Sequence, residues 1–161
     1  MYDMVRTKQS LPSEGYILLL GTALSVFSSN NGFIIENILH TDSSYSWYEL
    51  IDKESGRLMK HIEKTIANSN PAIAKKFGEI VEMRNRIIHG FRVTSPDGEQ
   101  VIATKVKSTG EQFIITEKYL IDFIKKNDEY SLEYNIGDIC EVTGTWYGGV
   151  HITGKSGIPV S

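Results

Sequence analysis

Arg84, Asn85 and His89 are the side chains whose types and spacing could best support chemistry in this sequence. Histidine exchanges protons near neutral pH and can act as a general acid or base. Arginine keeps its charge and presents a planar fork of donors that matches a phosphate group. Arg84 could therefore bind an anionic group, and Asn85 and His89 could act together on one face of a helix.

These residues belong to the segment 73–91, which has the most regular helical pattern in the chain. At about 100° per residue, its apolar side chains fall within about 60° of one direction, and Arg84 lies at the centre of that stripe. Asn85 and His89 fall on the other side, one turn apart. Gly90 is typical of a helix C-terminus. The apolar set is Ile73, Phe77, Ile80, Val81, Ile87, Ile88 and Phe91.

Arg84 needs an anion nearby, because a buried charge is costly when unpaired and arginine does not lose its proton. A phosphate would serve. A carboxylate on a neighbouring helix would serve equally, and a buried pairing with Asn31 is a further structural explanation. For His89 the structural alternative is a solvated residue that complements the helix dipole. The carboxylate candidates are Glu36, Glu49 and Asp52.

The run Arg84-Asn85-Arg86-Ile87-Ile88-His89 resembles the R-N-x-x-x-H signature of the HEPN superfamily (higher eukaryotes and prokaryotes nucleotide-binding). These proteins are small helical bundles that include many metal-independent ribonucleases of bacterial conflict systems. The resemblance covers about the first two-thirds of the chain as architecture, and Arg84, Asn85 and His89 as residues. It implies an endoribonuclease or an RNA-binding protein of a conflict or defence system.

The mechanism that the resemblance implies uses no metal and no other cofactor. His89 would exchange a proton with the ribose 2′-OH or the leaving oxygen, and Arg84 would neutralise the charge that develops on the phosphate. Asn85 would orient His89 or the phosphate. Arg86 lies on the same broad polar side as His89 and could bind an adjacent phosphate of the RNA. No zinc motif is visible in the sequence.

Arg84 and His89 lie about 140° apart on an ideal helix. They converge on one phosphate only if the last turn of the helix unwinds, or if two copies of the helix face each other. The resemblance implies the second arrangement, a composite site across a homodimer.

The composition is that of one globular domain: 161 residues, 40% hydrophobic and 23% charged. Its formal net charge of −3, from 17 basic and 20 acidic residues, has the wrong sign for a broad nucleic-acid surface, so an RNA site must be local. The single Cys140 excludes an intramolecular disulfide and a cysteine-rich zinc site. The N-terminus has no apolar signal core, and the run 16–20 is too short to cross a bilayer. We therefore expect a soluble, cytoplasmic protein.

The segments around 73–91 are predicted to be helices. Apolar residues at spacings of three and four predict one long helix from about Glu14 to Leu39, with Asn31 as the polar member of its apolar seam. A second helix is predicted from about Tyr45 to Ala67, and Pro71 suits the first turn of the third.

After Gly90 the apolar period changes from 3.6 to 2. The strands predicted by this pattern form a three-stranded antiparallel meander over about 91–115, and Thr116-Glu117 then begins a last helix. The meander directly follows His89 and is expected to form one wall around it. The predicted fold class is α+β, mainly α: a HEPN-like bundle over 1–134 with this meander between its third and last long helices.

The segment 135–161 is rich in glycine and is predicted to form an appended hairpin, not an independent domain. Trp146 and Tyr147 at its tip could stack on bases or fold back over the bundle.

A non-catalytic binding protein is the alternative function. An immunity or antitoxin protein that neutralises a nuclease toxin would suit the mild acidity of the chain, because such inhibitors complement a basic active site. An enzyme needs Arg84 and His89 together at a polar cleft, whereas an inhibitor needs a contiguous patch of Asp and Glu.

Overall fold

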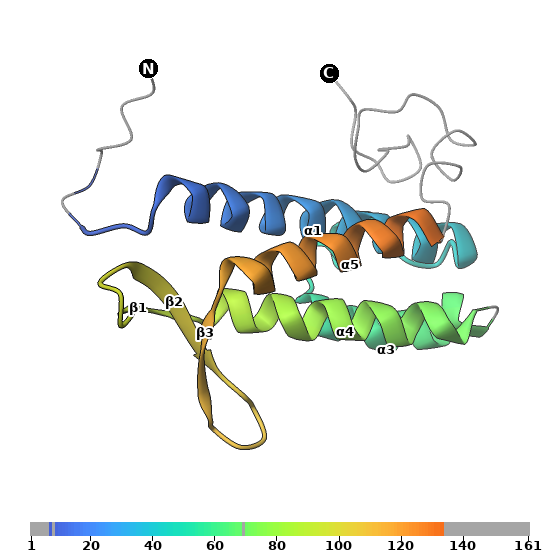
Figure 1. Cartoon of the computed structure of the whole chain (residues 1–161). Coiled ribbons are helices and arrows are strands. Elements are labelled where there is room, and N and C mark those ends of the chain that lie inside the picture. The colour runs from blue at the N-terminus through green and yellow to red at the C-terminus, as the bar shows by residue number, and fades with distance from the viewer. Residues whose placement is uncertain (1–6, 8, 69, 134–161) are drawn as a thin grey trace.

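The computed structural model describes residues 7, 9–68 and 70–133. The predicted hairpin at 135–161, with Trp146 and Tyr147, lies outside the described residues. Within them the chain is mainly helical with a small antiparallel sheet, as the α+β, mainly α class predicts. The long helices lie side by side, and the sheet lies at the end of the bundle where the first of them begins (Figure 1).

Helix α1 (Glu14–Thr41) is one continuous helix of 28 residues, as predicted. It begins where Ser13 Oγ accepts a hydrogen bond from the backbone N–H of Tyr16 at 3.2 Å, a side-chain cap that stabilises the first turn. By length and composition α1 is apolar enough to cross a membrane. In the structure it packs along the last helix and contributes to the hydrophobic core.

The predicted second helix, from Tyr45 to Ala67, is wrong: the chain forms two short α-helices and a 3-10 turn instead. The run 52–57 contains no apolar side chain, so a continuous helix would have nothing to bury there and a break costs little. Ile51, at the end of the first short helix, is 42% exposed. The observed elements are α2 (Trp47–Ile51), α3 (Ser55–Lys64) and η1 (Ile66–Asn68).

Helix α4 (Pro71–Ile88) confirms the predicted third helix, with Pro71 in its first turn. Most of its apolar stripe is buried, but Ile88 is 44% exposed and Phe91, the first residue of the sheet, is 43% exposed. The stripe therefore leaves the core at the C-terminal end of α4.

The sheet has the predicted order β1-β2-β3, with both pairs antiparallel. Its turns place Gly98 and Gly110 at positive φ, 87° and 75°, which glycine adopts without steric cost. The Tyr16 hydroxyl donates to the carbonyl of Ile115 at 2.7 Å and accepts from the N–H of Ile102 at 3.3 Å, so it joins the sheet to α1. The strands are β1 (Phe91–Thr94), β2 (Gln100–Lys105) and β3 (Gln112–Ile115).

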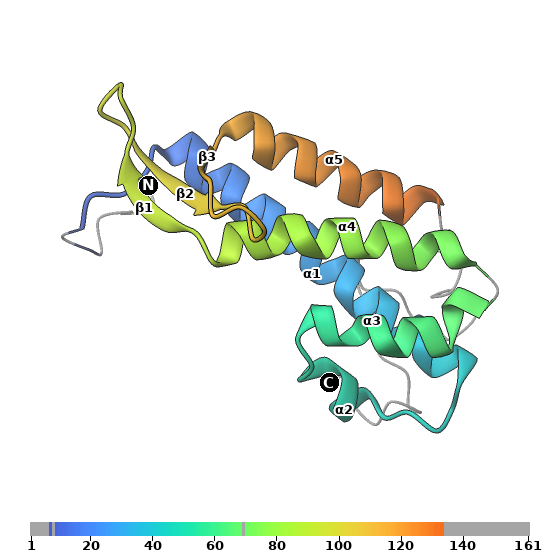
Figure 2. The same ribbon diagram turned by 90° about the horizontal axis from the view of Figure 1, so that it is seen from below.

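Helix α5 (Glu117–Glu133) returns the chain along α1 and α4, as predicted (Figure 2). The backbone N–H of Tyr119 donates to Thr116 Oγ1 at 3.1 Å, which caps its first turn. In the core the ring of Phe27 stacks with Phe77 at a centroid distance of 6.3 Å and with Phe123 at 6.2 Å. These contacts bring α1, α4 and α5 together in the core.

Candidate functional site

Arg84 is half-buried on α4, next to the aromatic core. Its guanidinium carbon lies 5.4 Å from the centroid of the Phe27 ring, and its Nη1 donates to Asn85 Oδ1 at 3.2 Å. Within the described residues it forms no ion pair, so none of the three carboxylates expected as partners pairs with it. An aromatic face and a neighbouring amide stabilise the charge instead.

His89 follows the last helical residue and has left the helical conformation, with φ −92° and ψ 16°. Its backbone N–H still donates to the carbonyl of Asn85 at 3.0 Å, and its side chain is exposed. The α-helical hydrogen bonding therefore continues up to His89, where the helix ends.

Arg84, Asn85 and His89 line one cavity within a single chain. It has a volume of about 250 Å³, and we call it the His89 cavity. Its remaining lining residues come from the N-terminal end of α3 and from Ile88. The full lining is Glu54, Ser55, Gly56, Arg84, Asn85, Ile88 and His89.

A second cavity of about 320 Å³ lies between α1, the α2–α3 junction and α4, and we call it the Asn31 cavity. It shares Glu54, Ser55, Arg84 and Ile88 with the His89 cavity. The two are therefore neighbouring parts of one cleft, with Arg84 in both. The residues that line only the Asn31 cavity are Leu24, Phe27, Ser28, Asn31, Ile51 and Lys53.

The wall of the His89 cavity differs from the expectation, because the sheet contributes none of its lining residues. The facing wall is formed by residues 54–56, where the predicted second helix is interrupted. Glu54 and Ser55 were therefore missed as site residues. The signal that could have found them is the polar run at 52–57, since a helix start is where the chain turns and exposes polar groups.

Asn31 and Arg84 do not form the hydrogen-bonded pair that would have explained both residues structurally. Both line the Asn31 cavity, but Asn31 Oδ1 is buried and has no hydrogen-bond partner in the described part of the chain. Buried carbonyl oxygens are almost always paired. Asn31 Oδ1 therefore lacks the hydrogen-bond donor that a buried carbonyl oxygen normally has.

Arg86 lies apart from the other three predicted site residues. Its Nη1 donates to the carbonyl of Lys105 at 2.7 Å, and its Nε lies 3.1 Å from Glu82 Oε1. These contacts join α4 to β2, and Arg86 lines neither cavity of the cleft. Its binding to RNA stays a prediction.

The charges around the cleft are of both signs. Lys53 and Arg84 line the Asn31 cavity together with Glu54. Glu54 Oε2 lies 3.7 Å from Arg57 Nε, but both side chains are highly exposed, so this pair is weak.

Over the described ranges no three side chains of His, Cys, Asp or Glu are grouped as metal ligands.

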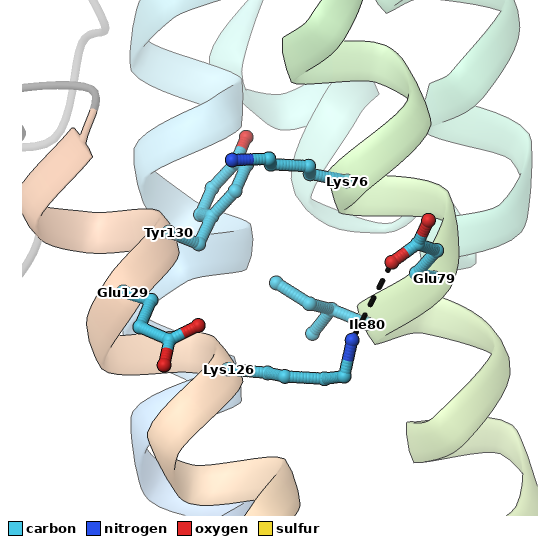
Figure 3. A pocket seen from close by; sticks show the side chains of 6 residues that line it. All are labelled: Lys76, Glu79, Ile80, Lys126, Glu129 and Tyr130. Atoms are coloured by element: carbon cyan, nitrogen blue, oxygen red, sulfur yellow. Dashed lines mark hydrogen bonds and ion pairs between the residues drawn. The ribbon is translucent and has the colours of Figure 1, made fainter.

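Two further cavities in the described part of the chain lie away from this cleft. One of about 80 Å³ lies between α4 and α5, with the ion pair of Lys126 Nζ and Glu79 Oε2, 3.5 Å apart, at one side and Tyr130 at the other (Figure 3). Another of about 540 Å³ lies between the sheet and the N-terminal ends of α1 and α5. It is lined in part by the carboxylates of Asp97, Glu99 and Glu117, and we call it the acidic cavity.

The fold and the cleft define a small, mainly helical domain with a sheet at one end and an Arg, Asn and His set at the end of its central helix. No protein-family model matches the sequence, and neither the curated proteins nor the solved structures contain a match. Membership of the HEPN superfamily therefore stays a prediction that rests on α4.

Proposed function

We propose that the protein is a HEPN-like, metal-independent endoribonuclease or RNA-binding protein of a bacterial conflict or defence system. The observation that supports this best is the common cavity lined by Arg84, Asn85 and His89. A phosphate in it would meet a guanidinium that lacks a carboxylate partner in the described chain. It would also meet an exposed imidazole.

In the proposed reaction the ribose 2′-oxygen attacks the adjacent phosphorus and the 5′-oxygen leaves. His89 exchanges a proton with the 2′-OH or with the leaving oxygen, while Arg84 neutralises the negative charge that builds up on the phosphate. Asn85 accepts a hydrogen bond from Arg84 and so holds the guanidinium in place. The homodimer implied by the family resemblance remains part of the proposal, and Arg84 and His89 also line a common cavity within one chain.

The test is cleavage of a mixture of labelled single-stranded RNAs by the purified full-length protein. His89→Ala should lower the cleavage rate by about 100-fold to 10,000-fold, the usual loss for a general acid or base. His40→Ala is the matched control, since His40 is an exposed histidine in the last turn of α1 that lines neither cavity. EDTA should leave the rate unchanged. A wild-type protein that neither cleaves nor binds RNA contradicts the proposal.

A second candidate function is neutralisation of a nuclease toxin by an immunity or antitoxin protein. The acidic cavity is the observation that favours it, because Asp97, Glu99 and Glu117 would complement a basic side chain of a toxin. This reading requires that the protein still protect cells against a co-encoded nuclease when both Arg84 and His89 are replaced by alanine. Loss of protection in an Asp97→Asn, Glu99→Gln, Glu117→Gln variant would support it.

A further inference from the structure

The Asn31 cavity has a mixed lining, in which polar residues outnumber apolar ones. Leu24, Phe27, Ile51 and Ile88 supply apolar walls, and Ser28, Asn31, Lys53, Glu54, Ser55 and Arg84 supply polar groups. Its volume of about 320 Å³ is at the lower end of the usual range of ligand sites, about 300–1,000 Å³. The cavity is therefore suited to one ring system and not to a large ligand.

Asn31 Oδ1 specifies one property of that ligand. The atom is buried and accepts no hydrogen bond within the described residues. It can only accept, so its partner must carry an N–H or O–H donor. A ligand that donates to it would recover the free energy lost by burying an unpaired carbonyl oxygen.

Arg84 specifies a second property. Its guanidinium lies over the Phe27 ring and lines both cavities of the cleft. Guanidinium planes stack on nucleic-acid bases and also bind phosphates. A ligand that places a ring in the Asn31 cavity and a phosphate in the His89 cavity would contact Arg84 with both parts.

We propose that the Asn31 cavity is a base-binding subsite that holds one unpaired base of an RNA strand, next to the phosphate bound in the His89 cavity. The base stacks against Arg84 and donates an N–H to Asn31 Oδ1. This inference rests on the proposed RNA-directed function. It adds that the strand must be unpaired at the site, because a base inside a duplex has both faces covered by neighbouring bases and cannot stack against Arg84.

The test measures binding of the full-length protein to short fluorescent RNA strands that are 2′-O-methylated, so that they cannot be cleaved. Three short strands are compared, in which every residue except the central one is abasic: the central residue carries adenine, no base, or unsubstituted purine, which lacks the amino group. Each strand therefore offers at most one base to the cavity. The strand with no base should bind about 10-fold to 100-fold more weakly than the adenine strand, the usual effect of one stacked base. The purine strand should bind about 3-fold to 10-fold more weakly, the usual effect of one hydrogen bond.

Asn31→Leu should remove the preference for adenine over unsubstituted purine. Asn37→Leu is the matched control and should keep it, since Asn37 is half-buried on the same helix but donates to the carbonyl of Phe33 at 2.9 Å and lines neither cavity. If Asn31→Leu fails to fold, the comparison of the three strands on the wild-type protein still tests the base-binding subsite.

The outcomes separate the two proposals. Tight binding of all three strands with equal affinity overturns the base subsite and leaves RNA binding intact. No binding of any strand, together with no cleavage of unmodified RNA, overturns the proposed function and the subsite with it. An adenine preference that Asn31→Leu does not reduce also overturns the subsite, because the donor would then be recognised elsewhere.

Discussion

The guanidinium of Arg84 lies 5.4 Å from the centroid of the Phe27 ring, with no carboxylate paired to it in the described chain. A cation over an aromatic ring gains about 0.5–2 kcal/mol, depending on how far it is removed from water. Phe27 is itself fixed by the rings of Phe77 and Phe123. The core therefore positions Arg84 at the cleft, and no carboxylate of the described chain neutralises its charge.

Arg84 is predicted to contribute more to activity than to stability. Arg84→Leu should keep or raise the melting temperature, because an apolar side chain of similar length can cover Phe27. Arg84→Ala should lower the free energy of unfolding by about 1–2 kcal/mol, since it uncovers that ring. Both should abolish RNA cleavage. Thermal denaturation and cleavage assays check this, and an Arg84→Ala protein unchanged in both would contradict it.

The strands and three long helices could be predicted from the sequence, because each has an apolar period that spans its whole length. The meander was predicted over about 91–115, and its strands run from Phe91 to Ile115 with turns at Gly98 and Gly110 between them. The interruption at 52–54 could not be predicted in the same way. There the polar run is compatible with an exposed helix face as well as with a break.

Contacts between helices were harder to predict than the helices and strands themselves. The sequence singled out Asn31 as the polar residue of the α1 seam, yet the residue that pairs with another helix is its neighbour Asn30. A one-residue step turns a helix by about 100°, and periodicity alone does not show which flank a second helix will cover. The cleft could not be predicted from periodicity either, because its second wall depends on where α3 begins.

Asn30 is predicted to be important for stability. Its Nδ2 donates to the carbonyl of Asn127 at 2.9 Å and to Asn127 Oδ1 at 3.0 Å, and both residues are buried. Asn30→Ala leaves the buried Asn127 Oδ1 without its donor and should cost about 1–3 kcal/mol in urea denaturation. Asn37→Ala, whose amide bonds only within its own helix, should cost clearly less. Equal losses would show that the link between α1 and α5 is not specific.

Gly90 is predicted to tolerate no side chain. A Cβ atom there would lie 2.2 Å from Ile102 Cγ2 and 3.0 Å from the carbonyl oxygen of Ala103. Gly90→Ala should therefore lower the free energy of unfolding by about 1–3 kcal/mol. The double variant Gly90→Ala, Ile102→Ala should lose less stability than the sum of the two single losses, because Ile102→Ala removes the Cγ2 atom that clashes. Gly21→Ala should instead stabilise the protein by up to about 1 kcal/mol, because Gly21 is an exposed helical residue with free space around it.

Glu36 is predicted to make stability depend on pH. It is buried, 3% exposed, and burial raises the pKa of its carboxyl from 4.5 to about 7. Between these values the folded state keeps the proton while the unfolded state releases it, so stability is highest at the acidic end and falls as the pH rises toward 7.

The matching variant is Glu36→Gln, which should flatten this part of the stability profile. Since one pKa unit corresponds to about 1.4 kcal/mol, the variant should exceed the wild type by up to about 3 kcal/mol at pH 8. Glu63→Gln, at an exposed position on α3, is the control and should leave the profile unchanged. Urea denaturation from pH 5 to pH 8 measures all three proteins, and a wild-type stability that rises over this range would contradict the prediction.

The last prediction concerns whether Arg84 and His89 act within one chain or across two. Both line the His89 cavity of a single chain, so we expect a mixture of Arg84→Ala and His89→Ala proteins to be inactive. In a composite site across a homodimer, a mixed dimer would instead regain one complete site, with Arg84 from one chain and His89 from the other. The two variants should be unfolded and refolded together so that any subunits exchange. Sedimentation then reports the oligomeric state, and RNA cleavage that returns in a dimeric mixture would establish the composite site in place of the single-chain one.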